Sequence, residues 1–276
     1  MKNAGNMTPA IDDAGVILCF VLGCDRAYLL SHYDRELGSN EEDRYFELIA
    51  LKAAGTPIQH ITGNREFMSL DFRVNSHVLI PRPETEILVE TVLDHVKNHA
   101  PDKCVRILDI GTGSGCIAVS LAYYIENCRI MASDISAEAL DVARLNSVAN
   151  GVSDKVTFIL SNLFENLQGM VFDVIISNPP YIPSREIESL QTEVKEHEPL
   201  IALDGGEDGL YYYRKIIKDA PRYLGKNGLL AFEVGYNQAC DVVRLMEERG
   251  FKGIKIVKDL SGIDRVIMGT YTFCHL

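Results

Sequence analysis

The class of fold follows from one stretch of the chain, Leu108-Asp109-Ile110-Gly111-Thr112-Gly113-Ser114-Gly115. It joins an apolar strand to a segment of helical length through a turn with three glycines. In an open α/β sheet, a glycine-rich turn after the first strand is where a nucleotide-like ligand binds. Cys116 stands where the dinucleotide-binding fingerprint has its third glycine, so that fingerprint is not met. We therefore expect residues 111–115 to hold another nucleotide-like cofactor; a tight turn without a ligand is the alternative.

Strands and helices alternate after this turn. The expected strands are Val105–Ile110, Arg129–Ser133, Val156–Leu160, Phe172–Ser177 and Leu229–Val234, and the expected helices run to about Tyr124, over 137–149, near 208–224 and near 238–249. Such alternation predicts an α/β fold, a mostly parallel Rossmann-like sheet with helices on both faces. The last two strands, Ile254–Val257 and Val266–Met268, leave no room for a crossover helix and should be antiparallel. The one long loop without a repeating pattern is Ile182–Leu203.

The residues before the sheet have a different pattern. Residues 12 to about 55 are expected to be helical, and the clearest helix begins at Ser39-Asn40, ahead of three acidic residues. Pro57 prevents its continuation. A small hairpin is expected between Ile61 and Ile80, and a new helix begins at Pro83. We therefore divide the chain into a helical domain (1–60), a hairpin linker (61–82) and a sheet domain (83–276).

The net charge, the cysteines and the apolar runs exclude several classes of protein. The 276 residues include 27 Lys and Arg against 39 Asp and Glu, a formal net charge of −12, which disfavours a nucleic-acid-coating surface. Seven cysteines without a Cys-x-x-Cys argue against a disulfide framework or a zinc ribbon and favour a reducing cytoplasm. The longest apolar run, Ala14 to Cys24, has 11 residues, against roughly 20 needed to cross a bilayer. No metal, membrane partner or targeting segment is expected.

Two further positions follow strands at the same edge of the expected sheet. Asp134 ends the second strand, 23 residues after Gly111. Its two oxygens match the two hydroxyls of a ribose, although capping of the next helix is an alternative for which Ser136 competes. Asn162 and Leu163 follow the third strand, where an amide can meet the edge of an adenine and a leucine its face. An ordinary Asn turn is the alternative there. These positions favour a cofactor that contains adenosine.

The most specific motif is Asn178-Pro179-Pro180-Tyr181, directly after the apolar strand that ends at Ser177. Two prolines fix two φ angles and remove two N–H donors, so this rigid backbone offers only carbonyl acceptors. The side-chain carbonyl of Asn178 adds another acceptor. The motif therefore suits a planar –NH2 group, whose two N–H donors would go to Asn178 and to the carbonyl of Pro179 while Tyr181 covers its flat face. A plain Pro-Pro loop is the alternative.

With this tetrapeptide the chain resembles the class I S-adenosylmethionine-dependent methyltransferases that act on planar nitrogens. More narrowly, from about Asp12 to Met268 it resembles the bacterial-type peptide-chain release factor N5-glutamine methyltransferases. The stretches that carry this resemblance are Leu79-Ile80-Pro81-Arg82-Pro83-Glu84-Thr85-Glu86, Asn178-Pro179-Pro180-Tyr181-Ile182, Ala202-Leu203-Asp204-Gly205-Gly206-Glu207-Asp208-Gly209-Leu210 and Asp259-Leu260-Ser261-Gly262-Ile263-Asp264-Arg265-Val266. Together they are specific for the family, whereas Asn-Pro-Pro-Tyr alone is not.

The resemblance implies a seven-stranded sheet and S-adenosyl-L-methionine as the cofactor, held by residues 111–115, Asp134, Asn162, Leu163 and Asn178. It implies the glutamine of a release factor's Gly-Gly-Gln loop as the substrate, bound and methylated at its side-chain nitrogen, N5, by Asn178, Pro179, Pro180 and Tyr181. The small N-terminal domain would help to grip the release factor. Two residues depart from the family pattern: Asn162 replaces the usual Asp, and His197 the usual Tyr. The first bears on cofactor affinity, because an amide carries less charge than a carboxylate.

The expected reaction is direct transfer of the methyl group to the glutamine nitrogen, with no ordinary general base before attack. The runner-up is an adenine-N6 nucleic-acid methyltransferase, because an adenine amine presents the same pair of donors. Such an enzyme binds phosphates and needs a basic surface, whereas residues 182–203 carry five Glu against Arg185 and Lys195. A non-catalytic cofactor-binding protein is a third alternative, which the intact Asn-Pro-Pro-Tyr motif disfavours. We therefore expect a protein amide as the substrate.

Overall fold

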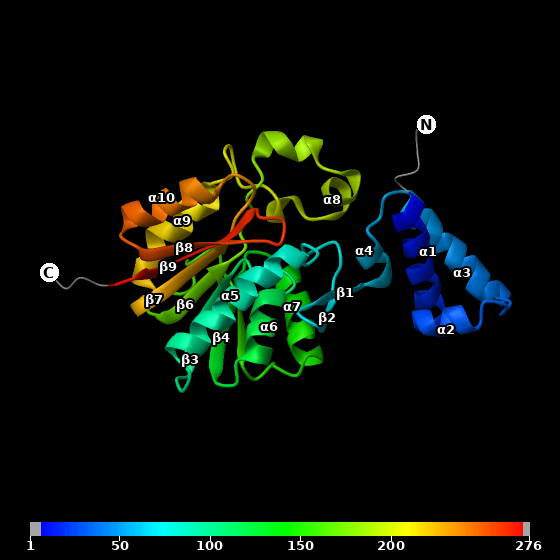
Figure 1. Cartoon of the computed structure of the whole chain (residues 1–276), viewed down its shortest axis with the longest axis horizontal. Helices are drawn as coiled ribbons and strands as arrows, with labels where there is room; N and C mark the ends of the chain where they lie inside the picture. Colours follow the sequence, from blue (N-terminus) through cyan, green and yellow to red (C-terminus); the bar gives the residue numbers. More distant parts are fainter. Residues whose placement is uncertain (1–6, 273–276) are drawn as a thin grey trace.

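The computed structural model describes residues 7–272 (Figure 1). Residues 1–6 and 273–276, which belong to the expected helical and sheet domains, lie outside the described residues. The described chain begins with four helices, continues through a hairpin and ends in a seven-stranded sheet with helices on both faces. In Figure 1 the first helices stand to the right of the sheet, and the hairpin lies between the two. Within residues 7–272, no helix is both long and apolar enough to span a membrane.

The N-terminal part consists of α1 (Met7–Leu22), α2 (Arg26–Ser31), α3 (Ser39–Ala53) and α4 (Ile58–Thr62). Ile17 of α1, Leu48 of α3 and Ile61 of α4 are buried against one another. They form a small apolar core that is separate from the cores of the sheet. Burial of these side chains holds the three helices together, because apolar area removed from water stabilises the packed arrangement.

Two details of this helical part differ from the prediction. α3 is capped by Gly38 rather than by Ser39 or Asn40, and the backbone N–H of Gly38 donates to Glu41 Oε2 at 2.9 Å. The Glu in the first turn thus satisfies the helix end, as in a capping box. As predicted, α3 ends before Pro57, at Ala53, but the short helix α4, which begins directly after Pro57, was not predicted. The fixed φ of Pro suits a helix start. A helix of five residues shows too little periodicity for a sequence pattern to predict it.

The predicted hairpin is formed by β1 (Asn64–Phe67) and β2 (Leu70–Arg73), which pair antiparallel. Its two turn residues, Met68 and Ser69, have φ of 52° and 57°. Two consecutive residues with positive φ are typical of the type I′ turn, whose twist matches the twist of the two paired strands. The chain then reaches α5 (Pro83–His99), which begins at Pro83 as predicted and carries two Glu in its first turn.

The sheet contains β3 (Val105–Ile110), β4 (Cys128–Asp134), β5 (Val156–Leu160), β6 (Phe172–Ser177), β7 (Leu224–Glu233), β8 (Lys252–Lys258) and β9 (Asp264–Tyr271), in the order β5-β4-β3-β6-β7-β9-β8. β3 lies between β4 and β6 and runs parallel to both. β9 is antiparallel to both of its neighbours, β7 and β8. The predicted seven-stranded, mostly parallel sheet with an antiparallel last strand is confirmed.

Helices cover both faces of this sheet (Figure 1). α5, α6 (Cys116–Tyr124) and α7 (Ala137–Ala149) cover one face, and α9 (Tyr211–Asp219) and α10 (Ala239–Arg249) cover the other. The central strands are buried on both sides and therefore form nearly continuous apolar runs in the sequence. After β3 the chain adds β4 and β5 on one side of it, and then returns to add β6 and the later strands on the other side. Ligands of open α/β sheets bind at the carboxyl end of such a switch point.

The structure corrects two boundaries outside the central strands. β7 begins at Leu224, whereas the predicted strand began at Leu229. The prediction started too late because residues 225–228 lack the apolar pattern by which a strand is recognised. The predicted loop of residues 182–203 contains three short helices, η1 (Ser184–Ser189), α8 (Thr192–His197) and η2 (Leu200–Ala202), and the predicted helix near 208–224 is α9 followed by η3 (Ala220–Arg222). Helices of three to six residues are too short for a hydrophobic period.

Candidate active site

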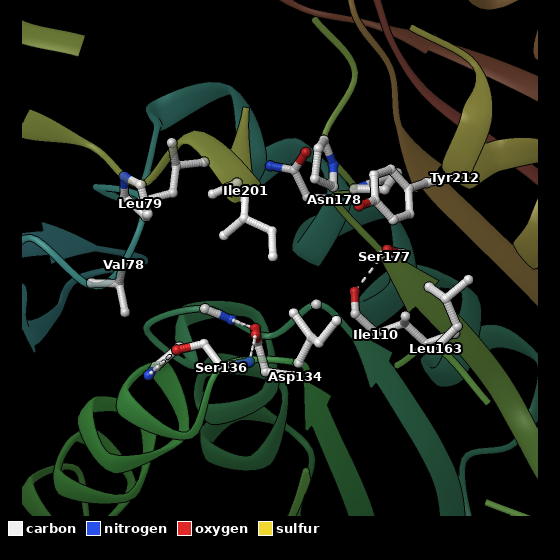
Figure 2. Close-up of a pocket in the computed structure, with 18 of the residues that line it drawn as sticks. Val78, Leu79, Ile110, Asp134, Ser136, Leu163, Ser177, Asn178, Ile201 and Tyr212 are labelled. Carbon is white, nitrogen blue, oxygen red and sulfur yellow. Dashed lines mark hydrogen bonds between the residues drawn. The ribbon is translucent and has the colours of Figure 1, made fainter. Parts of the chain in front are cut away.

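A cavity lies at the edge of the sheet where the carboxyl ends of β3, β4, β5 and β6 meet (Figure 2). Of the site residues predicted from the sequence, the cavity is lined by Gly111, Gly113, Asp134, Asn162, Leu163, Asn178, Pro179 and Pro180. The loops after four strands thus bring eight of the predicted residues to one place.

The glycine-rich loop presents bare backbone to this cavity. Gly111 and Gly113 have φ of +72° and +55°, in the left-handed region that side chains other than glycine adopt at a cost. No atom lies within 4 Å of the position that a Cβ would take on either residue. A side chain there would project into open space, so the two glycines leave room for a ligand to lie against the main chain.

Three residues of the same loop do not line the cavity. Thr112 Oγ1 donates to the buried carboxylate of Asp109 at 2.6 Å. The pKa of Asp109 is raised to about 7 by its burial, and this hydrogen bond opposes the rise. Ser114 is buried, and a Cβ on Gly115 would lie 2.9 Å from the Cβ of Ala143 in α7. Thr112, Ser114 and Gly115 therefore shape the turn and the packing of its helix, while their neighbours face the cavity.

Asp134 lies at the end of β4 with its carboxylate at the cavity wall. Its Oδ2 accepts from the backbone N–H of Gly113 at 2.8 Å, and its Oδ1 accepts from the N–H of Ser136 at 2.9 Å. Burial raises the pKa of Asp134, and the backbone hydrogen bonds counter this shift. Ser136, whose Oγ accepts from the N–H of Ala139, caps α7. Since each carboxylate oxygen has two lone pairs, Asp134 keeps capacity for two more donors from the cavity.

Asn162 and Leu163 bound the cavity on the side of β5. The side-chain Nδ2 of Asn162 donates to Glu165 Oε1 at 2.8 Å, which holds the amide in place. Leu163 has a φ of 51°, and its side chain packs at the margin of the core formed by α9, α10 and the sheet. Together with Ile110 and Tyr212 it gives this end of the cavity an apolar wall (Figure 2).

Asn178 lies across the cavity from Asp134 (Figure 2). Its Nδ2 donates to Thr85 Oγ1 at 3.2 Å, and Thr85 Oγ1 donates to Glu233 Oε2 at 2.6 Å. The nitrogen end of the Asn178 amide therefore points at α5, and its carbonyl end is left to accept a hydrogen bond from a ligand. Pro179 follows directly and lines the same wall. The arrangement can hold a planar –NH2 group by two acceptors.

Comparisons with known proteins show the family of this chain. Residues 83–196 match the family model of the methyltransferase small domain, and residues 1–63 match that of the PrmC N-terminal domain. The release factor glutamine methyltransferase of Clostridium acetobutylicum is 40% identical over 260 residues, which are 94% of this chain and 90% of that protein. The chain belongs to the release factor glutamine methyltransferase family. The family member from Geobacter sulfurreducens is 42% identical over 253 residues, 92% of this chain and 87% of that protein.

A solved structure shows that this chain has the fold of the Rossmann-like methyltransferases. A methyltransferase from Pyrococcus furiosus superposes with a TM-score of 0.56 at 19% identity, over 86% of this chain and 100% of that one. At this identity the likeness shows the fold alone. Family membership and fold together identify the chain as a methyltransferase, as the sequence resemblance predicted.

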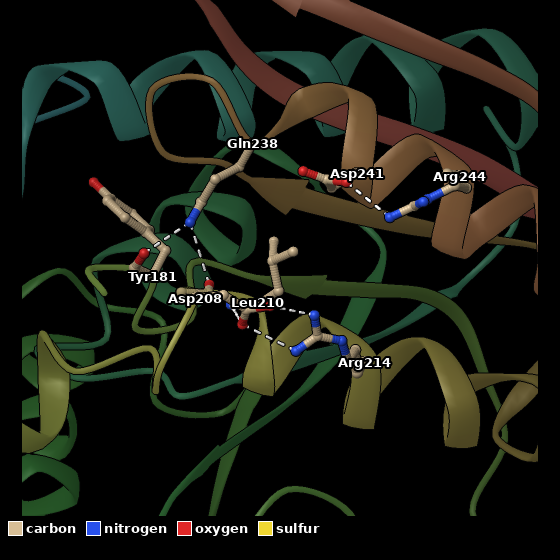
Figure 3. Close-up of polar contacts among 8 residues, drawn as sticks. Tyr181, Asp208, Leu210, Arg214, Gln238, Asp241 and Arg244 are labelled. Carbon is tan, nitrogen blue, oxygen red and sulfur yellow. Dashed lines mark hydrogen bonds and ion pairs between the residues drawn. The ribbon is translucent and has the colours of Figure 1, made fainter. Parts of the chain in front are cut away.

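The last residue of the family's Asn-Pro-Pro-Tyr motif, Tyr181, is not among the residues that line the cavity. Its backbone carbonyl accepts from Gln238 Nε2 at 2.8 Å (Figure 3). Gln238 Oε1 accepts from the N–H of Gly235 at 3.0 Å. A Cβ on Gly205 would lie 2.7 Å from the Cα of Tyr181, and one on Gly209 would overlap its carbonyl oxygen. Glycines of the 202–210 stretch thus let that segment pack directly on the motif's backbone.

Substitution of Gly209 tests this packing. Gly209→Ala is expected to displace the carbonyl of Tyr181 and to lower kcat by about 10- to 100-fold, because small misplacements of a reacting group are costly. The dissociation constant of the cofactor should stay close to that of the wild type, since Gly209 does not line the cavity. The value of kcat is measured at saturating methyl acceptor, and the dissociation constant is measured without acceptor.

The matched control is Gly151→Ala. Gly151 also has a left-handed φ, +70° against +74° at Gly209, but no atom lies within 4 Å of its Cβ position. Both variants carry the backbone strain of a left-handed alanine, roughly 1–2 kcal/mol, and only Gly209→Ala carries the overlap. Equal kcat in the two variants would show that the contact with Tyr181 is unimportant.

Several residues at the cavity were not predicted from the sequence as site residues. They are His77, Val78 and Leu79 of the linker, Pro199, Ile201 and Ala202 between α8 and Leu203, and Tyr212 and Ile216 of α9. Val78 packs with Ala139 and Val142 of α7, which fixes the linker over this edge of the sheet. Leu79 and Ala202 stood in the quoted family stretches, which was the only sequence signal for them.

Ion pairs join the helical part and the linker to residues 182–203. Arg82 Nη2 lies 2.7 Å from both carboxylate oxygens of Glu198, whose side chain is 1% exposed. Burial raises the pKa of Glu198, and the Arg82 charge counteracts it. Lys52 of α3 lies 2.7 Å from Glu193 of α8. Because Pro199 follows Glu198 and lines the cavity, these pairs help to set one wall of the site.

Proposed function

We propose that this chain transfers a methyl group from S-adenosyl-L-methionine to the side-chain nitrogen, N5, of the glutamine in the Gly-Gly-Gln motif of class-one translation release factors. The observation that carries the proposal is the orientation of Asn178, whose nitrogen end is bound by Thr85 and whose carbonyl end is left for a donor. The names of the relatives at about 40% identity support the choice of a release factor as the substrate.

The residues at the cavity fit the proposed cofactor. S-adenosyl-L-methionine supplies a methyl group made electrophilic by its sulfonium. Asp134 would accept the ribose hydroxyls, and Asn162 and Leu163 would contact the adenine edge and face. Gly111 and Gly113 leave open space beside the main chain, into which a ligand can pack without meeting a side chain. These assignments follow the order β3, β4, β5 in the sheet: the loop after β3 provides the main-chain glycines, the end of β4 would face the ribose, and the loop after β5 the adenine.

The proposed role of the Asn-Pro-Pro-Tyr motif is to orient a poor nucleophile. The lone pair of an amide nitrogen is delocalised into its carbonyl, so alignment must supply much of the rate. Holding reacting atoms near 3–3.5 Å contributes roughly 7–11 kcal/mol. The carbonyls of Asn178 and Pro179 would accept the two N–H groups and favour the positive charge that develops on nitrogen. Tyr181 would contact the substrate beyond the cavity wall, and Pro180 would keep the motif rigid.

The proposal extends to the parts of the chain outside the cavity. Residues 1–60 would contact the body of the release factor, residues 61–82 would link them to the site, and residues 83–276 would perform the transfer. The Lys52–Glu193 and Arg82–Glu198 pairs support this arrangement, because each joins an N-terminal segment to the stretch that leads to Pro199, a residue of the cavity wall. A translation factor as the substrate places the reaction in the cytoplasm.

A label-transfer experiment tests the proposed function. The purified chain is incubated with tritium-labelled S-adenosyl-L-methionine and, separately, with a release factor, the same factor lacking the Gly-Gly-Gln glutamine, DNA and RNA. Label is expected in the intact factor alone. Labelling of DNA or RNA would instead support the adenine-N6 alternative, and labelling of no macromolecule would support a binding protein without catalysis.

A further inference from the structure

Three side chains from distant parts of the sequence meet behind the wall of the cavity. Thr85 lies in the first turn of α5, Glu233 ends β7, and Asn178 follows β6. Thr85 and Glu233 are 2% and 1% exposed. Asn178 Nδ2 donates to Thr85 Oγ1 at 3.2 Å, and Thr85 Oγ1 donates to Glu233 Oε2 at 2.6 Å. Only Asn178 of the three lines the cavity.

The direction of these hydrogen bonds fixes the orientation of the Asn178 amide. A hydroxyl has a single hydrogen, and that of Thr85 goes to Glu233. Thr85 can then only accept from Asn178, so the nitrogen end of the amide must face it. An amide turned by 180° would set its carbonyl against the oxygen of Thr85 and would present N–H groups to the cavity. Such an amide would repel the N–H donors of a substrate.

The buried carboxylate reinforces this direction. Burial raises the pKa of Glu233 to about 7, while hydrogen bonds from Thr85 and Asn178 and the charge of Arg265 lower it and Glu84 raises it. A carboxylate has no hydrogen to donate, so in its charged form it accepts from both neighbours. Buried polar groups that lose their partners cost stability. The carboxylate of Glu233 is a buried polar group, and an apolar side chain at this position would avoid the cost.

We propose that Thr85 and Glu233 are positioning residues that lock the Asn178 amide with its carbonyl toward the methyl acceptor. The inference rests on the proposed function and adds two residues to it that touch neither substrate nor cofactor. It also gives a role to Thr85 of the Leu79–Glu86 stretch, a residue that does not line the cavity.

Substitutions that keep the volume of Thr85 test the proposal. Thr85→Val removes the hydroxyl and keeps the shape, and it is expected to lower kcat for release-factor methylation by about 10- to 100-fold. Thr85→Ser keeps the hydroxyl and is expected to retain most of the rate. The dissociation constant of S-adenosyl-L-methionine should be unchanged in both, since Thr85 does not line the cavity. Wild-type kcat in Thr85→Val, or an equal loss in Thr85→Ser, would overturn the inference.

Glu233→Gln provides a second, independent variant if Thr85→Val folds poorly. An amide can donate to Thr85 as well as accept from it, so the direction of the chain of hydrogen bonds is no longer fixed, and kcat should fall by about 10-fold. Unchanged kcat in Glu233→Gln would refute the role of Glu233. The wild type separates the two proposals: if it leaves the release factor unmethylated, the proposed function fails, whereas equal activity in wild type and variants defeats only the positioning role.

Discussion

Asn178→Ala is expected to abolish measurable turnover while the chain still folds and binds S-adenosyl-L-methionine. The substitution removes the side-chain carbonyl of Asn178 and leaves the carbonyl of Pro179 alone to accept from the –NH2 group of the glutamine. Loss of one group that stabilises developing charge costs about 10²- to 10³-fold in kcat, and loss of alignment adds to this. Single-turnover methylation of a release factor measures the rate, and calorimetric titration measures cofactor binding.

Asn162→Ala is the matched control, because Asn162 is an asparagine that lines the same cavity on the side of β5. Its substitution should weaken cofactor binding and leave kcat at saturating cofactor close to that of the wild type. The two asparagines therefore separate acceptor positioning from cofactor binding. Substantial methylation by Asn178→Ala would show that the side chain of Asn178 is not needed for the reaction.

Asp134→Ala is expected to raise the dissociation constant of S-adenosyl-L-methionine by about 100-fold or more. Hydrogen bonds to a charged group contribute about 1.5–3 kcal/mol each, and every 1.4 kcal/mol is tenfold in affinity. The substitution removes both proposed bonds to the ribose. It also frees the N–H groups of Gly113 and Ser136, which Asp134 accepts at 2.8 and 2.9 Å, so the glycine-rich loop loses its anchor.

Asp134→Asn is the control for the shape of the side chain. It keeps one acceptor oxygen and should give an intermediate affinity, between those of the wild type and Asp134→Ala. Titration of each variant with the cofactor, in the absence of any methyl acceptor, measures the effect directly. An affinity in Asp134→Ala close to that of the wild type would show that the adenosine lies elsewhere.

The sheet could be predicted from the sequence because its central strands are buried on both faces. β3 and β6 match the predicted residues at both ends, since each is an apolar run that ends in a Gly-rich or Pro-rich turn. Short helices such as α8 could not be predicted, because six residues do not complete two helical turns. Capping of α3 by Gly38 was missed because two capping residues, Ser39 and Asn40, stand beside it.

Only part of the site could be predicted from the sequence. The loop at 111–115 predicted the edge of the sheet at which the cavity lies, but its pattern does not separate Gly111 and Gly113, which line the cavity, from Thr112 and Gly115, which face inward. Thr85 and Glu233 are 148 residues apart in the sequence, and they come into contact only because α5 and the end of β7 lie side by side in the fold. No local pattern reports such a contact, because it depends on tertiary packing.

Mass spectrometry of the methylated substrate tests the central claim most directly. The chain is incubated with S-adenosyl-L-methionine and a purified release factor, the factor is digested, and the peptide that contains Gly-Gly-Gln is fragmented. We predict that this peptide gains the mass of one methylene group and that the fragments place it on the glutamine side chain. An unmodified glutamine in a reaction that consumes the cofactor, with the methyl group on another residue or on nucleic acid, would contradict the assignment.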